Sequence, residues 1–158
     1  MSTDTITIER TVSASPARVW ELWTTSDGIS AWWAPEGFRT DVTALDLRPE
    51  GELVYTMTAV APEQIAFIEQ YGMPLSTESR KRFVAIEEPR AISYLSLIDF
   101  VPDHEPYEHL TEVELHAEGD GTRVVMHVAP LHDAVWTDRL VQGRANELDN
   151  LAALVDAE

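Results

Sequence analysis

The sequence predicts an α+β fold in which an antiparallel sheet of about seven strands curves around one long C-terminal helix. Residues 5–12 alternate between two sets of side chains, which is typical of a half-buried strand. Several similar runs follow between residues 38 and 129, separated by turn sequences. Residues 133–157 instead place apolar side chains at steps of three or four without an internal proline, which indicates one amphipathic helix. The chain is expected to form a single domain, residues 1–158.

Two short helices are expected after the first strand. Ser15 is placed to cap the first helix, and Pro16 occupies its first turn, where the missing N–H of proline costs no hydrogen bond. The second helix is expected to be capped by Ser26 or Asp27 and to end at Pro35.

Six further strands are expected downstream of these helices. Residues 38–47 and 51–60 are joined by a Pro-Glu-Gly turn and therefore predict a hairpin. Two more strands flank Pro89, and two flank Asp120-Gly121, a strong hairpin signal.

Two segments do not fit the strand pattern. Residues 61–79 are expected to be an insertion over the sheet that contains a short helix ending near Gly72 and Pro74. Residues 101–109 form a polar, proline-containing loop of the kind that often borders a binding site.

Composition excludes several classes of function. The formal net charge of −17 opposes binding to nucleic acid, and no apolar run is long enough for membrane insertion. The chain has no cysteine, so thiol chemistry is excluded, and no secretory signal is recognisable, so a cytoplasmic location is expected. No cofactor is expected, because the chain has neither a phosphate-binding loop nor a dinucleotide motif. The excess of arginine over the single lysine, Lys81, is interpreted as a compositional bias.

Four segments carry a resemblance to a known family: VWELWTTSDGISAWWAPEGF, DLRPEGE, EEPRAI and DGTRVVM. With the expected order of elements, they make the chain similar to the START-like SRPBCC superfamily, and within it to the C-terminal domain of the heat-shock-chaperone ATPase activator. The resemblance implies the helix-grip fold, with a hydrophobic cavity between a curved sheet and the C-terminal helix. It also implies binding of lipids, hormones, polyketides or other apolar molecules, since only a minority of members are cyclases, dehydratases or hydrolases.

Two departures from the family pattern bear on the cavity. Gly143-Arg144 stands where the family often has Gly-Trp, so a cation replaces a large apolar side chain. The insertion at residues 61–79 is longer than usual and is expected to cover or narrow the cavity mouth. The activator's N-terminal chaperone-binding domain has no room in 158 residues, so a chaperone partner is not expected.

The expected function is binding of a hydrophobic or amphipathic small molecule, such as a lipid, polyketide or aromatic acid, in that cavity. The alternatives are a cavity enzyme of cyclase, dehydratase or hydrolase type and an interaction module like the activator; a homodimer is also considered. Catalysis, if present, would be proton transfer by a histidine, a tyrosine or a carboxylate. The expected binding residues are Trp33, Tyr55, Met57, Tyr94, Glu114, His127, Arg144 and Leu148, with His127, Tyr55, Tyr94 and Glu114 as the candidate acids or bases.

Arg144 lies on the apolar stripe of the last helix and is expected to face the sheet. A buried guanidinium must be paired, because an isolated buried charge is very costly. Its partner is either an anionic ligand or a protein carboxylate on a neighbouring strand, with Glu112, Glu114 and Asp99 as candidates.

Trp20 and Trp23 are interpreted mainly as core residues. Adjacent helical positions diverge by about 100°, so only one of the tandem tryptophans is expected to face inward, and Trp33 is the one expected to contact the cavity. 

Other polar residues are interpreted as structural. Arg48 is expected to support its turn by pairing with Asp46 or Glu50. His116 and His127 are expected to form a cross-strand pair, and the histidine spacing predicts no metal site.

Overall fold

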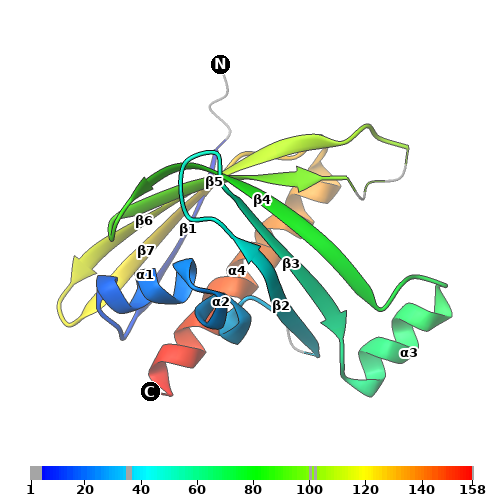
Figure 1. Ribbon diagram of the computed structural model, residues 1–158, viewed down its shortest axis with the longest axis horizontal. Coiled ribbons are helices and arrows are strands. Elements are labelled where there is room, and N and C mark those ends of the chain that lie inside the picture. Colours follow the sequence, from blue (N-terminus) through cyan, green and yellow to red (C-terminus); the bar gives the residue numbers. More distant parts are fainter. Residues whose placement is uncertain (1–4, 35–36, 100, 102, 158) are drawn as a thin grey trace.

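The computed structural model describes residues 5–34, 37–99, 101 and 103–157 (Figure 1). These residues form seven strands and four helices. In chain order the elements are β1 (Ile6–Val12), α1 (Pro16–Thr24), α2 (Ser26–Trp32), β2 (Phe38–Leu45), β3 (Glu52–Ala59), α3 (Pro62–Gln70), β4 (Ser76–Glu87), β5 (Ala91–Ile98), β6 (Tyr107–Glu118), β7 (Gly121–Val128) and α4 (Ala134–Asp156).

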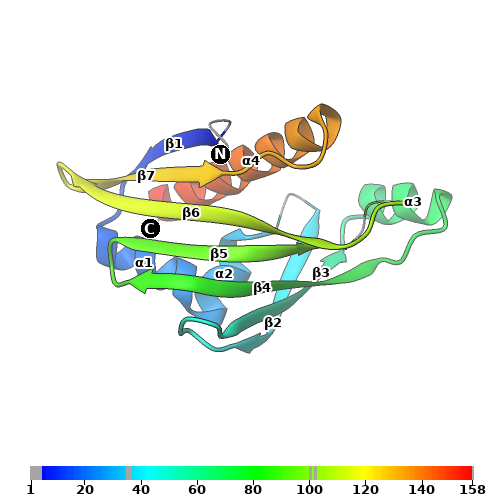
Figure 2. The same cartoon turned by 90° about the horizontal axis from the view of Figure 1, so that it is seen from above.

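All seven strands belong to one antiparallel sheet with the order β1-β7-β6-β5-β4-β3-β2. From β2 to β7, each strand pairs with the next one in the sequence. The first strand, β1, pairs with β7 and forms one edge of the sheet. Figure 2 shows how the sheet twists along its length. The predicted α+β helix-grip architecture, with about seven strands and a long terminal helix, is therefore confirmed.

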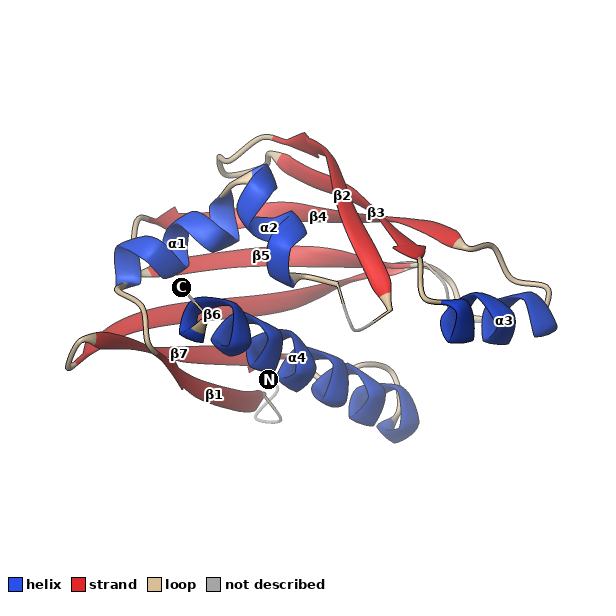
Figure 3. Cartoon of the chain, turned by 90° about the horizontal axis from the view of Figure 1, so that it is seen from below, coloured by secondary structure: helices blue, strands red, loops and turns tan. Residues whose placement is uncertain are grey.

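One face of the sheet carries α1, α2 and α4 (Figure 3). In β6, the buried residues His109, Thr111 and Val113 alternate with more exposed ones, so they point toward the helices. The opposite, outer face of the sheet carries the intervening side chains. The hydrophobic core lies between the sheet and the three helices.

The long helix α4 is buried mainly in its C-terminal half. Its buried residues are Arg144, Leu148, Leu151 and Val155, at steps of three and four. Most residues before Arg144 are partly or fully exposed, and Figure 1 shows the N-terminal end of α4 extending away from α1 and α2. Among the described residues, no helix combines the length and apolar character needed to cross a bilayer.

Side-chain caps fix where the helices begin. Ser15 Oγ accepts the N–H of Arg18 at 3.2 Å, as predicted. The second cap was expected at Ser26 or Asp27 but is Thr25, whose Oγ1 accepts the N–H of Gly28 at 3.0 Å. Thr25 has extended backbone angles that aim its hydroxyl at this N–H, whereas Ser26 is already helical. Pro35, expected to end this helix, lies outside the described residues.

The turn between β2 and β3 explains Arg48. Its Nε donates to Asp46 Oδ2 at 2.7 Å, which confirms one of its two predicted partners. Glu50 bonds Arg82 instead, at 3.2 Å. A Cβ on Gly51 would lie 2.1 Å from the carbonyl oxygen of Asp46, so only glycine fits there without a shift of the backbone.

The insertion contains the predicted short helix but lies in a different place from the one expected. Its helix, α3, has no buried residue and stands beyond the ends of β3 and β4 rather than over the sheet (Figure 1). Phe67 and Tyr71 contact each other with ring centroids 5.0 Å apart, while remaining 58% and 62% exposed. The reason is that residues 76–79 continue β4 outward, which carries the connection past the core.

Both tandem tryptophans are buried, each only 2% exposed, so the expectation that only one faces inward is wrong. The helix α2 packs against α1, β2 and α4, so both rings are enclosed even though Ser30 and Ala31 of the same helix are exposed. Trp32 Nε1 donates to the carbonyl of Leu22 at 2.8 Å. Trp33, which directly follows α2, lies against Tyr55 and Tyr94 of the sheet, and its ring centroid is 5.0 Å from that of Trp32.

Candidate ligand-binding site

Lys81, the only lysine of the sequence, is buried between the sheet and the helices at 6% exposure. The alternation of β4 places Lys81 and Phe83 on the inner face, while Arg80 and Arg82 face outward. Lys81 Nζ donates to Ser96 Oγ of the adjacent strand β5 at 2.9 Å. An amine that is usually at the surface thus lies inside the core.

Three aromatic rings surround this amine. Lys81 Nζ lies 5.8 Å from the ring centroid of Trp33, 5.7 Å from that of Tyr55 and 5.4 Å from that of Tyr94. These distances fit cation–π contacts, which favour the ammonium form. Burial acts more strongly in the opposite direction and, together with the positive charge of Arg144, lowers the pKa of Lys81 to about 7.

Arg144 is the second buried cation, at 5% exposure. Its Nη1 donates to Glu147 Oε2, one helical turn along α4, at 3.4 Å, and its Nη2 donates to Thr111 Oγ1 of β6 at 3.3 Å. Its Nε has no partner among the described residues. Arg144 faces the sheet as predicted.

The predicted carboxylate partners of Arg144 were wrong. Glu112 and Glu114 alternate with Thr111 and therefore lie on the outer face of β6. Asp99 follows the last residue of β5 and is exposed. The carboxylate comes instead from Glu147 on the same helix.

This buried cluster has more donors than acceptors. Lys81 and Arg144 are accompanied by one carboxylate, Glu147, whose side chain is 18% exposed. Tyr94 Oη and His109 Nδ1 are buried without a hydrogen-bond partner in the described part of the chain. Burial raises the pKa of Tyr94 above its usual value and lowers that of His109, so both side chains are neutral at pH 7.

Five of the eight predicted binding residues gather at this cluster. Trp33, Tyr55, Tyr94, Arg144 and Leu148 are all buried there. Met57, two residues after Tyr55 on the same face of β3, is half-buried and packs against the same core.

Glu114 and His127 lie elsewhere, on the outer face of the sheet. Glu114 accepts hydrogen bonds from His116 Nε2 at 2.8 Å and His127 Nε2 at 2.9 Å, and these bonds lower the pKa of its carboxyl. Thr7 Oγ1 lies 3.1 Å from His127 Nδ1 on the same face. Their predicted position under the helix is therefore wrong, and the cross-strand histidine pair is bridged by a carboxylate.

The interior is closed in this structure. Trp33, Tyr94 and Leu148 retain 2% or less of their surface, so water has almost no access to them. A surface hollow of about 350 Å³ lies elsewhere, between α1, α2 and Leu154 of α4. A cavity that a ligand could enter as the structure stands is thus not shown.

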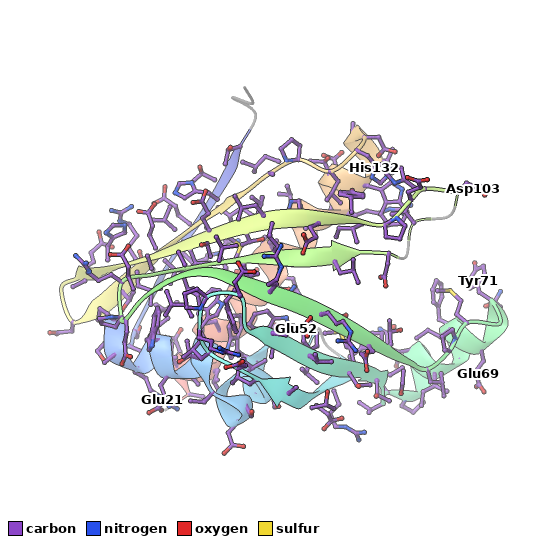
Figure 4. All side chains as sticks on the ribbon, turned by 45° about the horizontal axis from the view of Figure 1, so that its top comes forward. Glu21, Glu52, Glu69, Tyr71, Asp103 and His132 are labelled. Carbon is purple, nitrogen blue, oxygen red and sulfur yellow. The ribbon has the colours of Figure 1, made fainter. Side chains whose placement is uncertain are left out.

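The loop expected at residues 101–109 is shorter than predicted, because β6 begins at Tyr107 and places His109 in the buried cluster. His104 lies at another end of the molecule, with its ring centroid 4.3 Å from that of His132. Figure 4 shows His132 and Asp103 close together there, while Tyr71 projects from α3. Tyr107 Oη bonds His132 Nδ1 at 2.7 Å. No group of three side chains suited to a metal ion occurs in the part of the chain that the structure describes.

Sequence reasoning missed Lys81 and Glu147 as members of this site. Lys81 lies between two arginines in RKR, a sequence that resembles an exposed, charged strand. The available signal was the period-two pattern of β4, which places position 81 on the same face as Phe83.

The fold is that of a helix-grip protein of the START-like SRPBCC class. The chain belongs to the family described as Activator of Hsp90 ATPase homolog 1-like protein, whose model matches residues 13–156. No curated protein matches the chain at a significant level.

Solved structures of proteins from several bacteria share the fold. A Chromobacterium violaceum protein has a TM-score of 0.74 at 22% identity, covering 96% of this chain and 97% of its own. The AHSA1-like protein from Aeromonas hydrophila has a TM-score of 0.74 at 20% identity, covering 97% of this chain and 92% of its own. The AHSA1 protein from Silicibacter pomeroyi has a TM-score of 0.73 at 18% identity, covering 97% and 98%.

Proposed function

We propose that this protein binds an amphipathic small molecule between the sheet and α4, and that Arg144, which lies beside Lys81, receives its anionic group. The observation that carries the proposal is the excess of buried cationic and donor groups over acceptors. Two basic side chains lie in a cluster with one partly exposed carboxylate, that of Glu147, which contacts only Arg144 among them. A carboxylate or similar anion would supply the missing acceptor.

The unpartnered donors support the same ligand chemistry. Arg144 Nε and Tyr94 Oη are buried without a partner among the described residues. Leaving such groups unsatisfied costs free energy, which a ligand oxygen would recover. The formal net charge of −17 repels anions from the surface, so this interior cluster is a local exception.

The apolar part of the ligand would contact the aromatic side of the cluster. Trp33, Tyr55 and Tyr94 present ring faces, and Leu148 and Met57 add aliphatic surface. Such a combination of apolar walls and a few polar groups is usual in small-molecule sites. Aromatic acids and fatty acids have the matching chemistry.

Entry requires a movement, since the interior is closed. The helix α4 is the element suited to it, because its burial is concentrated from Arg144 onward. We expect the N-terminal half of α4 to move away from the sheet when a ligand enters.

The binding proposal is tested by thermal unfolding with 4-methylbenzoate and decanoate, each compared with its neutral primary amide. A ligand that binds only the folded state raises the melting temperature. We expect the acids, and not the amides, to raise it. Equal effects of acids and amides would remove the role of the cations, and no effect of any compound would contradict the proposal.

The double variant Arg144→Met/Glu147→Gln locates the site. It removes the buried ion pair together, so neither partner is left as an isolated charge. We expect it to lose the acid-induced shift, whereas Arg39→Met, at an exposed position paired with Asp41, keeps it. An undiminished shift in the double variant would place binding elsewhere.

The two alternative functions have less support. An interaction module would use the exposed Phe67, Tyr71 and Met73 of the α3 region, and its test is capture of purified Hsp90. A cavity enzyme needs an ionisable group in the interior. Lys81 is such a group, although it was not among the acids and bases predicted from the sequence. A homodimer stays a prediction, which native mass spectrometry would test.

A further inference from the structure

We propose that Lys81 is a carbonyl-reactive amine, whose Nζ forms an imine with an aldehyde or ketone group of the bound molecule. This inference rests on the proposed function and narrows the ligand class to an amphipathic anion that also carries a carbonyl. It assigns a covalent role to the only lysine of the chain, in addition to its hydrogen bond with Ser96.

The surroundings of Nζ favour an amine over an ammonium. It donates a hydrogen bond to the neutral Ser96 hydroxyl, and no carboxylate contacts it among the described residues. Three aromatic rings and the closed core keep water away from it. A buried lysine that served only for stability would ordinarily be paired with an acid.

Arg144 strengthens this effect. A lysine becomes a nucleophile when it is desolvated or placed next to another cation, and Lys81 meets both conditions. With a pKa of about 7, roughly half of the Lys81 side chains are neutral at pH 7. For an exposed lysine of ordinary pKa, the neutral fraction at that pH is about one in 2,500.

The reaction is balanced without a further reactant. The lone pair of Nζ attacks the carbonyl carbon, a C–N bond forms, and the carbonyl oxygen takes up a proton to give a carbinolamine. Loss of that hydroxyl with the second amine proton gives the imine and one water molecule. Arg144 would hold the anionic group, and the unpartnered Tyr94 hydroxyl is available to donate to the carbonyl oxygen.

Several charged or titratable groups face this amine and set its pH response. They come from four elements packed around Lys81: Tyr55 of β3, Tyr94 of β5, His109 of β6, and Arg144 and Glu147 of α4. The tyrosines are neutral at pH 7 because burial raises their pKa, and that of His109 is lowered by burial.

Reductive trapping tests the inference. The folded protein is incubated at pH 7 with 4-formylbenzoate and sodium cyanoborohydride, and the modified residue is identified by peptide mass spectrometry. The variant Arg90→Lys provides an internal reference, since position 90 is exposed, with 75% of its side-chain surface open. Lys81 and the introduced amine then compete within one chain.

We expect Lys81 to be modified at least about tenfold faster than the introduced amine at pH 7, because its neutral fraction is far larger. The ratio should fall toward one in denaturant, where both amines have ordinary surroundings. Modification of Lys81 at the same rate as the reference, or more slowly, would overturn the inference.

A carbonyl-free analogue separates this inference from the binding proposal. 4-Methylbenzoate keeps the carboxylate and cannot form an imine. If it raises the melting temperature while 4-formylbenzoate leaves Lys81 unmodified, binding stands and the imine is excluded. Lys81→Met should abolish the adduct at position 81. In the wild type, an adduct found at the N-terminal amine alone would also count against Lys81.

Discussion

The surroundings of Lys81 differ strongly from those of a typical, solvent-exposed lysine. Its ammonium would be surrounded by rings and a hydroxyl, next to a second cation and away from water. The folded protein therefore holds this proton weakly, whereas the unfolded chain holds it with an ordinary lysine pKa near 10.4. Stability is thereby linked to pH through a single side chain.

Lys81→Met should remove this linkage. The folded pKa is about 7 and lies below the unfolded value, so the unfolded state binds more protons between about pH 7 and 10. Wild-type stability consequently gains with rising pH in this window, and methionine, of similar shape, gains nothing from this source. We expect the stability advantage of Lys81→Met to be largest at and below pH 7, at a few kcal/mol, and to shrink toward pH 9.5.

Urea unfolding of both proteins at pH 6, 7, 8 and 9.5 measures this difference. Taking the difference between the two proteins cancels the other titrating groups they share. A difference that stays constant over this range would show that Lys81 has an ordinary pKa in the folded protein.

At the scale of elements, two glycines differ in whether the structure has room for a side chain at their position. A Cβ on Gly143, within α4, would meet no atom within 4 Å, so alanine fits there. A Cβ on Gly51 would collide with the backbone of Asp46. Gly143→Ala should raise the free energy of unfolding by roughly 0.5–1 kcal/mol through helix propensity, and Gly51→Ala should lower it by about 1–3 kcal/mol.

Chemical denaturation of the two variants alongside the wild type checks both signs. If Gly143→Ala also weakens ligand-induced stabilisation, the glycine contributes to the movement of α4 as well. A destabilising Gly143→Ala would contradict the open surroundings seen at this position.

The elements were more predictable than the site. Hairpin turns and the spacing in α4 are local signals, and they gave the right order of strands and helices. The site depends on which face of each strand points inward. Where polar residues occupy inward positions, the alternation of apolar and polar residues no longer shows which face that is. In β6 the inward positions include His109 and Thr111, while Leu110 points outward, so the pattern did not show that Glu114 lies outside.

The prediction that only one of the tandem tryptophans faces inward was wrong for a related reason. The angular argument assumes that one side of a helix meets solvent. The short helix α2 packs against several elements, so Trp32 and the residue that follows the helix, Trp33, both find core partners. Such enclosure arises from tertiary contacts and is not visible in one helix's sequence.

At the scale of the whole molecule, charge is the dominant surface property. The chain has 28 acidic and 11 basic residues, and its ion pairs lie mostly on exposed side chains. Exposed pairs contribute little, whereas net repulsion among the remaining carboxylates opposes the compact state.

Salt should therefore stabilise this protein. Raising NaCl from about 20 mM to about 300 mM shortens the screening length from roughly 20 Å to below 10 Å. We expect the melting temperature to rise, with most of the gain below about 150 mM, as screening rather than salting-out requires. A melting temperature that falls with salt would show that the surface ion pairs outweigh the repulsion.

The packing of Trp23, Trp32 and Trp33 has an optical consequence. Their ring centroids lie 4.8 Å and 5.0 Å apart along the series, and Trp33 at its end contacts the aromatic surroundings of Lys81. In the closed protein these indoles emit from a dry environment, at short wavelength. Any displacement of α4 that admits water or a polar guest to Trp33 shifts that emission to the red, so intrinsic fluorescence can time the opening of the interior without an added dye.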